Sequence, residues 1–241
     1  MDTNKNSYTL IYAIVMVVIV AFLLSFVASA LKDRQTANVE LDKKKQILSS
    51  LQIDLKGQDA EALYNKYIVN GLVINSAAEV LEESKDVAFY IDVVKEMNKP
   101  FAERQLPIYV AEVDGETKYI VSLHGAGLWG PLWGYLALND DRNTIFGTYF
   151  SHAGETPGLG SNITEPAFQN QFIGKHILNS EREFVSVAVM KVGTRSAGKE
   201  QVDALSGGTI TSKGVEDMLY NSLVQYDKFF QQNNETEGEN E

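Results

Sequence analysis

Hydrophobic residues are concentrated without interruption near the start of the chain. No charged side chain occurs between Lys5 and Lys32, and the segment between them is almost wholly apolar. A helix that crosses a bilayer needs roughly 20 apolar residues, each rising about 1.5 Å. The sequence therefore predicts an N-terminal tail over residues 1–7 and a transmembrane helix over residues 8–31. A buried core helix and a cleaved signal peptide are the alternatives, but the apolar region of a signal peptide runs only about 7–15 residues.

Beyond this segment, isolated hydrophobic residues recur at helical spacing. Residues 32–56 are polar with apolar positions interspersed, which predicts that the membrane helix continues or restarts as a stalk. Residues 59–67 and 79–98 also follow a helical pattern. Within the second of these, the apolar run 87–91 is equally consistent with a strand.

Runs of β-branched and aromatic residues occupy the middle of the chain. Asp114-Gly115 is a strong hairpin signal and lies between two such runs. The pattern becomes helical again over residues 215–230, and the acidic end at residues 231–241 predicts a disordered tail. Together these elements predict one α+β domain over residues 57–230, built on an antiparallel sheet. Its predicted strands cover residues 108–113, 118–123, 134–138, 144–151 and 184–192.

Composition narrows the classes of ligand. The net charge of −11 argues against a nucleic-acid partner, since affinity for a phosphate backbone needs clustered cations. The chain has no cysteine, which excludes disulfides, thiolate metal sites and iron–sulfur clusters held by this chain. Its three histidines, His124, His152 and His176, are too scattered in the sequence to predict a metal site.

Charge leaves the orientation in the membrane open. Lysine and arginine are more frequent after the apolar segment than before it, and the positive-inside rule then places the soluble domain in the cytoplasm. A folded domain of this length can nevertheless translocate despite its flanking charges.

Three glycine-rich segments can carry chemistry. In the first, residues 125–134 (GAGLWGPLWG), four glycines and a proline argue against regular structure. Its Leu128 and Trp129 suit either a packed surface loop or a platform for a planar aromatic cofactor. In the second, residues 152–160 (HAGETPGLG), Pro157-Gly158 predicts a turn, beside which Glu155 and Thr156 can hydrogen-bond a heterocycle.

The third segment, residues 203–214 (DALSGGTITSKG), leads directly into the last predicted helix. Thr211 or Ser212 can act as its N-cap. Backbone N–H groups in the glycine turn, together with the positive end of the helix, would form a seat for a phosphate. A plain capped helix start is the alternative. The spacing of a Walker phosphate loop is absent.

The segments GLWGPLWG, HAGETPGLG and DALSGGTITS, in this order behind one N-terminal span, resemble the NqrC family, one of the subunits of the sodium-translocating NADH:quinone reductase. The resemblance implies an FMN-binding domain in which the FMN phosphate is esterified to the threonine that ends a Ser/Thr-Gly-Ala-Thr element preceded by an aspartate. Here the element reads Ser206-Gly207-Gly208-Thr209, with Asp203 in the aspartate position. Thr209 is therefore the predicted acceptor and Thr211 the other candidate, while Gly208 departs from the usual alanine. The implied flavin contacts are Leu128, Trp129, Glu155, Thr156 and Leu159.

The resemblance further implies an electron-transfer subunit of an inner-membrane complex, a translocase, that relays electrons from NADH toward quinone. It implies other subunits of that complex, the lipid bilayer and a flavin transferase as partners, a single span with the flavin domain in the periplasm, and no independent turnover. One rival is the related FMN-carrying subunit of ferredoxin:NAD complexes, against which the GLWGPLWG segment and the long stalk argue. The other rival is a tethered binding module with no redox role.

Overall fold

The computed structural model describes residues 6–232, so the predicted acidic tail, apart from its first two residues, and the first five residues of the predicted N-terminal tail lie outside it. The chain forms two units, Met1–Lys43 and Lys44–Glu241. A single helix, α1 (Asn6–Ser50), includes the predicted membrane segment and most of the predicted stalk. Its apolar part is long enough to cross a membrane, and none of that part is buried within the protein. This finding agrees with the predicted span.

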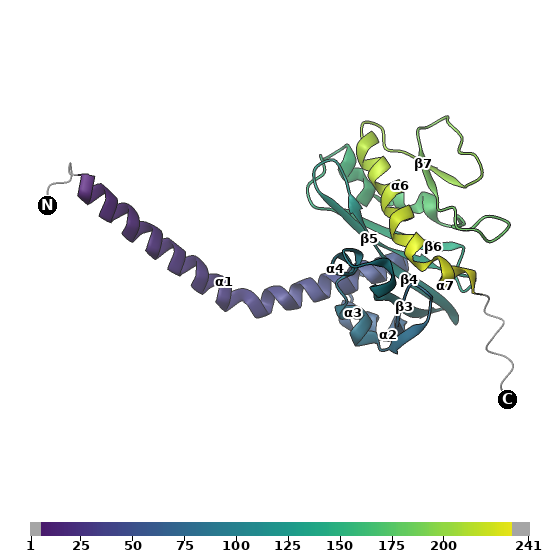
Figure 1. The fold of residues 1–241 in the computed structure, drawn as a ribbon, viewed down its shortest axis with the longest axis horizontal. Helices are drawn as coiled ribbons and strands as arrows, with labels where there is room; N and C mark the ends of the chain where they lie inside the picture. The colour runs from purple at the N-terminus through teal and green to yellow at the C-terminus, as the bar shows by residue number, and fades with distance from the viewer. Residues whose placement is uncertain (1–5, 233–241) are drawn as a thin grey trace. The chain divides into compact units, whose positions relative to one another are not determined.

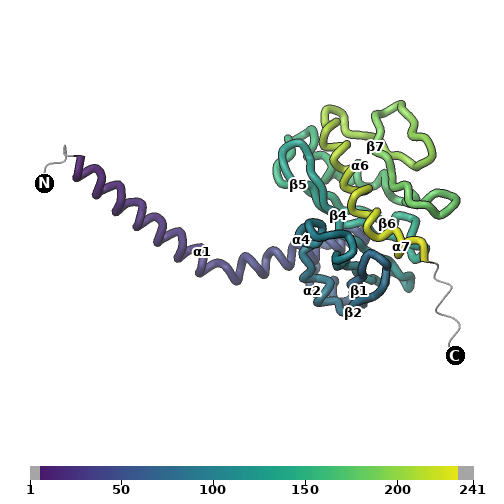
Figure 2. Tube along the Cα trace, viewed as in Figure 1, coloured from purple at the N-terminus to yellow at the C-terminus, as the bar shows by residue number. Residues whose placement is uncertain are grey.

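The second unit is built on a six-stranded antiparallel sheet in the order β2-β1-β3-β4-β5-β6 (Figures 1 and 2). Helices flank this sheet, and a small parallel pair, β7-β8, lies outside it. The predicted α+β class is confirmed. The strands are β1 (Ile68–Ile74), β2 (Val80–Glu83), β3 (Leu106–Val113), β4 (Glu116–Ala126), β5 (Pro131–Leu138), β6 (Ile145–His152), β7 (Ala188–Met190) and β8 (Gln201–Asp203).

Short helices connect and cover these strands. The longest helix of the second unit, α6 (Thr209–Leu223), packs on β4 and is followed by a single turn, η4 (Val224–Tyr226), and by α7 (Asp227–Gln231). The remaining helices are α2 (Ala60–Tyr67), α3 (Lys85–Tyr90), α4 (Val93–Met97), η1 (Phe101–Glu103), η2 (Gly160–Thr164), α5 (Pro166–Gln169) and η3 (Asn170–Phe172).

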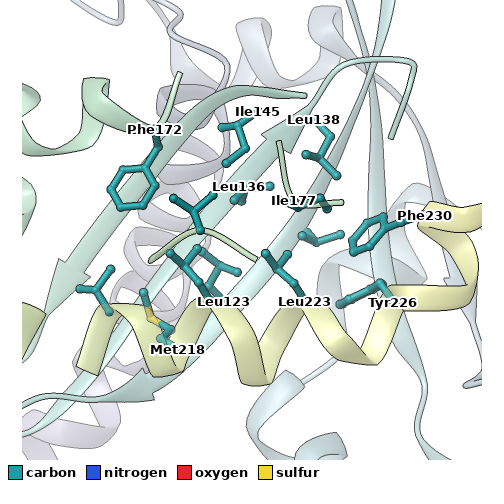
Figure 3. Packing of buried hydrophobic residues seen from close by; sticks show 14 of the residues in the cluster. Leu123, Leu136, Leu138, Ile145, Phe172, Ile177, Met218, Leu223, Tyr226 and Phe230 are labelled. Carbon is teal, nitrogen blue, oxygen red and sulfur yellow. The ribbon is translucent and has the colours of Figure 1, made fainter. Parts of the chain in front are cut away.

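One face of the sheet carries the main hydrophobic core. Alternate residues of β3 to β6 point toward α6 and toward the irregular segments that follow β6, as expected for a strand with a two-residue side-chain period. Figure 3 shows Leu123 and Leu136 of the sheet facing Met218 and Leu223 of α6. All four side chains are buried.

The opposite face is covered by the end of α1. Ile47, Leu48 and Leu51 are fully buried, and the Trp133 indole donates a hydrogen bond to Gln46 at 3.2 Å. The helix ends at Ser50, six residues before the predicted end of the stalk. Its last turn is therefore part of the folded domain, which explains why apolar residues recur at the end of an otherwise polar stretch.

Local sequence accounts for several elements. Asp114 and Gly115 both have positive φ, 54° and 82°, as a two-residue hairpin turn of type I′ requires. The Asp59 carboxylate accepts a hydrogen bond from the backbone N–H of Glu61 and caps α2. The run 87–91 is helical through Tyr90, as the helical interpretation predicted.

Other expectations differ from the structure. Of the predicted strand 184–192, only β7 is observed, and the rest of that segment is irregular. The first glycine-rich segment was expected to lack regular structure, but it forms the end of β4, a tip at residues 127–130 and the start of β5. Two of its glycines lie within an antiparallel pair, where Gly125 opposes Leu132 and Gly134 opposes Leu123. The sequence patterns missed β1, β2 and β8. The helical pattern over residues 79–98 was therefore wrong at its start, where β2 lies, and the rest of that range forms two short helices, α3 and α4.

Two glycines bring α6 close to β4. A Cβ added to Gly214 would lie 2.4 Å from the carbonyl oxygen of Ala126, and a Cβ added to Gly125 would lie 2.6 Å from Cβ of Met218. The first of these contacts is with backbone, which cannot rotate away. The start of α6 is therefore held against the end of β4.

We expect Gly214→Ala to destabilise the domain by about 1–3 kcal/mol through overpacking. Elsewhere in a helix the same change would stabilise by roughly 0.5–1 kcal/mol, so the sign of the effect is diagnostic. Gly154→Ala is the control, because an added Cβ there meets nothing within 4 Å. Urea denaturation followed by circular dichroism measures both. Equal stability of the two variants would contradict the close packing of α6 on β4.

Candidate functional site

The three glycine-rich segments meet at one open pocket of about 200 Å³. The tip of the β4–β5 hairpin, the loop after β6 and the start of α6 each contribute to its wall. Segments that lie far apart in the sequence are thus joined in one place. The lining residues are Leu128, Glu155, Thr156, Leu159, Gly160, Gly207, Gly208, Thr209, Ile210 and Thr211.

A buried carboxylate connects the three segments. Glu155 is only 5% exposed. One of its oxygens accepts a hydrogen bond from the backbone N–H of Trp129 at 2.9 Å, and the other accepts one from the Thr211 hydroxyl at 2.5 Å. The hairpin tip and the first turn of α6 are therefore both fixed to the loop that carries Glu155.

Glycines make room for this carboxylate. A Cβ added to Gly127 would lie 2.4 Å from Oε1 of Glu155, and a Cβ added to Gly160 would lie 2.5 Å from Oε2 and 2.3 Å from the Thr211 hydroxyl. Any other residue at either position would push the carboxylate or its partner aside. These two glycines therefore serve packing around Glu155.

The start of α6 differs from its expected cap. Gly208 occupies the N-cap position and makes no side-chain cap hydrogen bond, so Thr209 is the first helical residue. Thr211 and Ser212 lie inside the helix, and Ser212 instead accepts a hydrogen bond from the backbone N–H of Leu205 at 3.0 Å. The expectation that Thr211 or Ser212 caps the helix was wrong. The first N–H groups of a helix have no partner within it, so this end remains suited to an anion.

Exposed side chains surround the pocket. Thr209 is exposed, and the apolar Leu128, Leu159 and Ile210 are 48%, 42% and 57% exposed. Trp129, at 67%, lies beside them on the hairpin tip. Hydrophobic side chains concentrated around one opening are unusual on a free surface and are typical of a binding site.

The structure brings together most of the residues predicted for the site. Leu128, Glu155, Thr156, Leu159, Gly207, Gly208 and Thr209 all line the pocket, whereas Trp129, Ser206 and Asp203 do not. Asp203 ends β8, and its backbone N–H donates a hydrogen bond to the Gln171 side chain at 2.8 Å. Gly160 and Ile210 also line the pocket and were not predicted; each is next to a predicted residue, but only the fold shows that it faces the opening.

A cation near the start of α6 is already paired. Lys213 forms ion pairs with Asp217 at 2.9 Å and with Glu216 at 3.1 Å. Hydrogen bonds with these two carboxylates, first that with Asp217, raise the pKa of Lys213 above its ordinary value. The positive end of the helix, rather than a lysine, is therefore what this part of the pocket offers to an anion.

A second, larger pocket of about 460 Å³ shares no lining residue with this site. It lies between residues 176–180 and 198–200, which are linked there by a contact between His176 and Glu200. Within residues 6–232, no group of three or more histidine, aspartate or glutamate side chains is placed to hold a metal ion.

Comparison with known proteins defines the class. The FMN-binding domain family matches residues 127–224, a range that begins at the hairpin tip and includes every residue of the pocket. NqrC, a subunit of the Na(+)-translocating NADH-quinone reductase, is 31% identical to this chain in Vibrio parahaemolyticus over 237 residues and 32% identical in Vibrio alginolyticus over 232, each covering 90% of both chains.

Solved structures agree with these relatives. The same subunit from Parabacteroides distasonis is 50% identical, with a TM-score of 0.78, over 85% of this chain and 98% of that one. NqrC of Shewanella oneidensis is 25% identical, with a TM-score of 0.66, over 80% and 97%. The chain belongs to the NqrC family of Na(+)-translocating NADH-quinone reductase subunits, and the resemblance drawn from the three motifs is confirmed.

The two adjacent glycines of the pocket should respond differently to alanine. Gly207 has φ +73°, and an added Cβ would lie 2.6 Å from Cδ2 of Leu159. Gly208 has φ −112°, and its added Cβ would come no closer than 3.1 Å, to Cβ of Leu205. We expect Gly207→Ala to cost about 1–2 kcal/mol, because a left-handed conformation is strained for alanine. Gly208→Ala should cost less, because its φ is allowed for alanine and Leu205 needs to move by only a few tenths of an ångström. Urea denaturation compares the two, and a reversed order would contradict this turn geometry.

Proposed function

We propose that the chain is the electron-transfer subunit of a sodium-pumping NADH:quinone reductase and carries FMN through a phosphoester to Thr209. The observation that carries the proposal is the exposed Thr209 side chain at the first position of α6, on the wall of an open pocket with an apolar rim. The family to which the chain belongs supplies the class of complex.

The residues present fit FMN. The N-terminus of α6 offers unpartnered N–H groups and the positive end of the helix dipole to a phosphate attached at Thr209. The exposed Leu128, Trp129 and Leu159 offer apolar surface to a flat ring system. At about 200 Å³, the pocket is smaller than the roughly 300–1,000 Å³ of sites that enclose a ligand of this size. A covalent bond would retain a cofactor that the pocket does not enclose.

Thr209 is a better acceptor than Thr211. The Thr211 side chain is 2% exposed, and its hydroxyl proton is engaged by Glu155. Thr209 is exposed and is free of both constraints. A transferase that must reach the hydroxyl and remove its proton therefore has access to Thr209 alone of the two.

The part played by this chain is to hold and orient the cofactor. When bound, the flavin supplies the electron-carrying chemistry. Leu128 and Leu159 bound the pocket on two sides, and the hydrogen bond from Trp129 to Glu155 fixes the hairpin tip beside them. Since these side chains leave the pocket open, electrons can pass to and from neighbouring subunits. No residue of the chain is assigned a catalytic role, and no turnover is expected of it alone.

In this proposal, α1 anchors the protein in the inner membrane, with the flavin domain in the periplasm, where a flavin transferase attaches FMN. The remaining subunits of the complex receive and deliver the electrons and couple the flow to sodium export. The related subunit of ferredoxin:NAD complexes is the closest alternative; the names of the relatives support the sodium-pump subunit. The other rival, a tethered binding module without a flavin, is separated from both by the next experiment.

Full-length protein produced together with the transferase should carry one FMN, attached with loss of one water. Thr209→Ala should abolish the attachment, whereas Thr209→Ser and Thr211→Ser should keep it, because both leave a hydroxyl at position 209. Mass spectrometry of the peptide that contains both threonines, and flavin fluorescence in a denaturing gel, measure the result. A chain of unmodified mass would refute the proposal, and a flavin on Thr211 in the original protein would refute the choice of acceptor.

Orientation is tested by a reporter joined after residue 232. Alkaline phosphatase, which is active only outside the cytoplasm, should be active in this fusion. A fluorescent protein that matures only in the cytoplasm should be dark at the same position. The opposite pair of results would place the domain in the cytoplasm, as the lysines after the span suggest.

A further inference from the structure

The wall of the flavin pocket contains a buried negative charge without a cationic partner. Among the ion pairs of residues 6–232 none involves Glu155, although the residue is only 5% exposed. Its two oxygens are satisfied by an amide and by a hydroxyl. Both are neutral donors, which stabilise the carboxylate without cancelling its charge.

We propose that the carboxylate of Glu155 lowers the reduction potential of the flavin carried at Thr209. The inference rests on the proposed function, since it requires a flavin in the pocket that Glu155 and Thr209 both line. An electron taken by the flavin from a reduced donor, which is oxidised in the same step, adds negative charge to the pocket unless a proton follows. A fixed carboxylate in the wall opposes that charge.

The position of Glu155 makes this opposition strong. Charges separated by water interact weakly, whereas charges within a protein interact several times more strongly because the effective dielectric constant is lower. Burial also keeps mobile ions away from the carboxylate, so salt screens it less than it screens surface charges. The acidic side chains near the start of α6, Glu216 and Asp217, are both paired with Lys213. Glu155 is therefore the acidic residue of the site whose charge is least compensated.

The surrounding contacts allow the charge to be removed with little change of shape. In Glu155→Gln, the side-chain oxygen can accept the hydrogen bond from the Trp129 N–H. The new amide N–H can donate to the Thr211 oxygen, with the direction of that hydrogen bond reversed. Both links between the segments are then kept, and the negative charge is lost.

The experiment uses full-length protein made together with the transferase. Mass spectrometry first establishes that each variant carries FMN; if the original protein does not, the proposed function fails and this inference falls with it. Potentiometric titration with dithionite as reductant, followed by flavin absorbance, then gives the midpoint potentials. We expect Glu155→Gln to raise the midpoint potential, and the rise to persist when the ionic strength is increased.

Glu112→Gln is the matched control for charge. Glu112 is exposed on β3 and pairs with Thr117, nine residues before Ala126 at the end of β4, which is roughly 30 Å at the rise of a strand. The potential of this variant should not change. If Glu155→Gln carries FMN and keeps the original potential, or if Glu112→Gln raises the potential equally, the inference is overturned while the proposed function stands.

A second pair of variants, both at Thr211, separates the effect of charge on the potential from the effect of packing. This pair also tests the inference if Glu155→Gln does not fold. Thr211→Val keeps the volume and the Glu155 carboxyl group but removes one of its two hydrogen-bond donors. Because loss of a donor disfavours the ionised form, both Thr211 variants are titrated at alkaline pH, where the carboxyl group is ionised in each. The less compensated charge should lower the potential relative to Thr211→Ser, which keeps the hydroxyl. A Thr211→Val potential equal to or above that of Thr211→Ser would overturn the inference.

Discussion

The candidate site depends on the hydrogen bonds of one buried carboxylate. Burying a carboxylate without partners costs several kcal/mol, so the hydrogen bonds from Trp129 and Thr211 stabilise Glu155 in its buried position. In turn, these two hydrogen bonds fix the backbone of the hairpin tip and the first turn of α6 to the loop that carries Glu155. The hairpin tip, the loop after β6 and the start of α6 consequently stabilise one another, and the pocket forms as a unit rather than as three independent loops.

The sheet supplies the rigid frame for this unit. The β4–β5 pairing continues in register from Tyr119 opposite Leu138 to Ala126 opposite Pro131, so the hairpin tip begins directly at the end of regular structure. The contact between Gly214 and the Ala126 backbone fixes α6 against the same strand end. Thr209 is less than two turns before Gly214 in α6. Its position relative to the tip is therefore set by the close approach of two backbones.

Sequence predicted the elements whose signals are local. The turn at Asp114-Gly115 needs only two residues of suitable conformation, and the apolar span needs only length and composition. The three glycine-rich segments were recognised because their order matches a known family. Sequence could not predict that residues 125–134 are mostly strand, because glycine is a poor strand former and only pairing with a neighbour overrides its preference. Nor could it predict that Thr211 points inward to Glu155, since the two are joined solely by the fold.

The same arrangement explains how exposure and fixation are combined at one site. An electron carrier that serves neighbouring subunits needs an accessible cofactor, yet an open pocket provides little of the burial on which affinity depends. In the proposed function, a covalent bond at Thr209 supplies retention, and the pocket is left to determine orientation and electrostatics. The structure divides the two threonines accordingly. Thr209 is exposed where a bond would be made, and Thr211, two residues later, is buried where the wall is held together. A helix start with only one of these hydroxyls could provide either the attachment or the bracing, but not both.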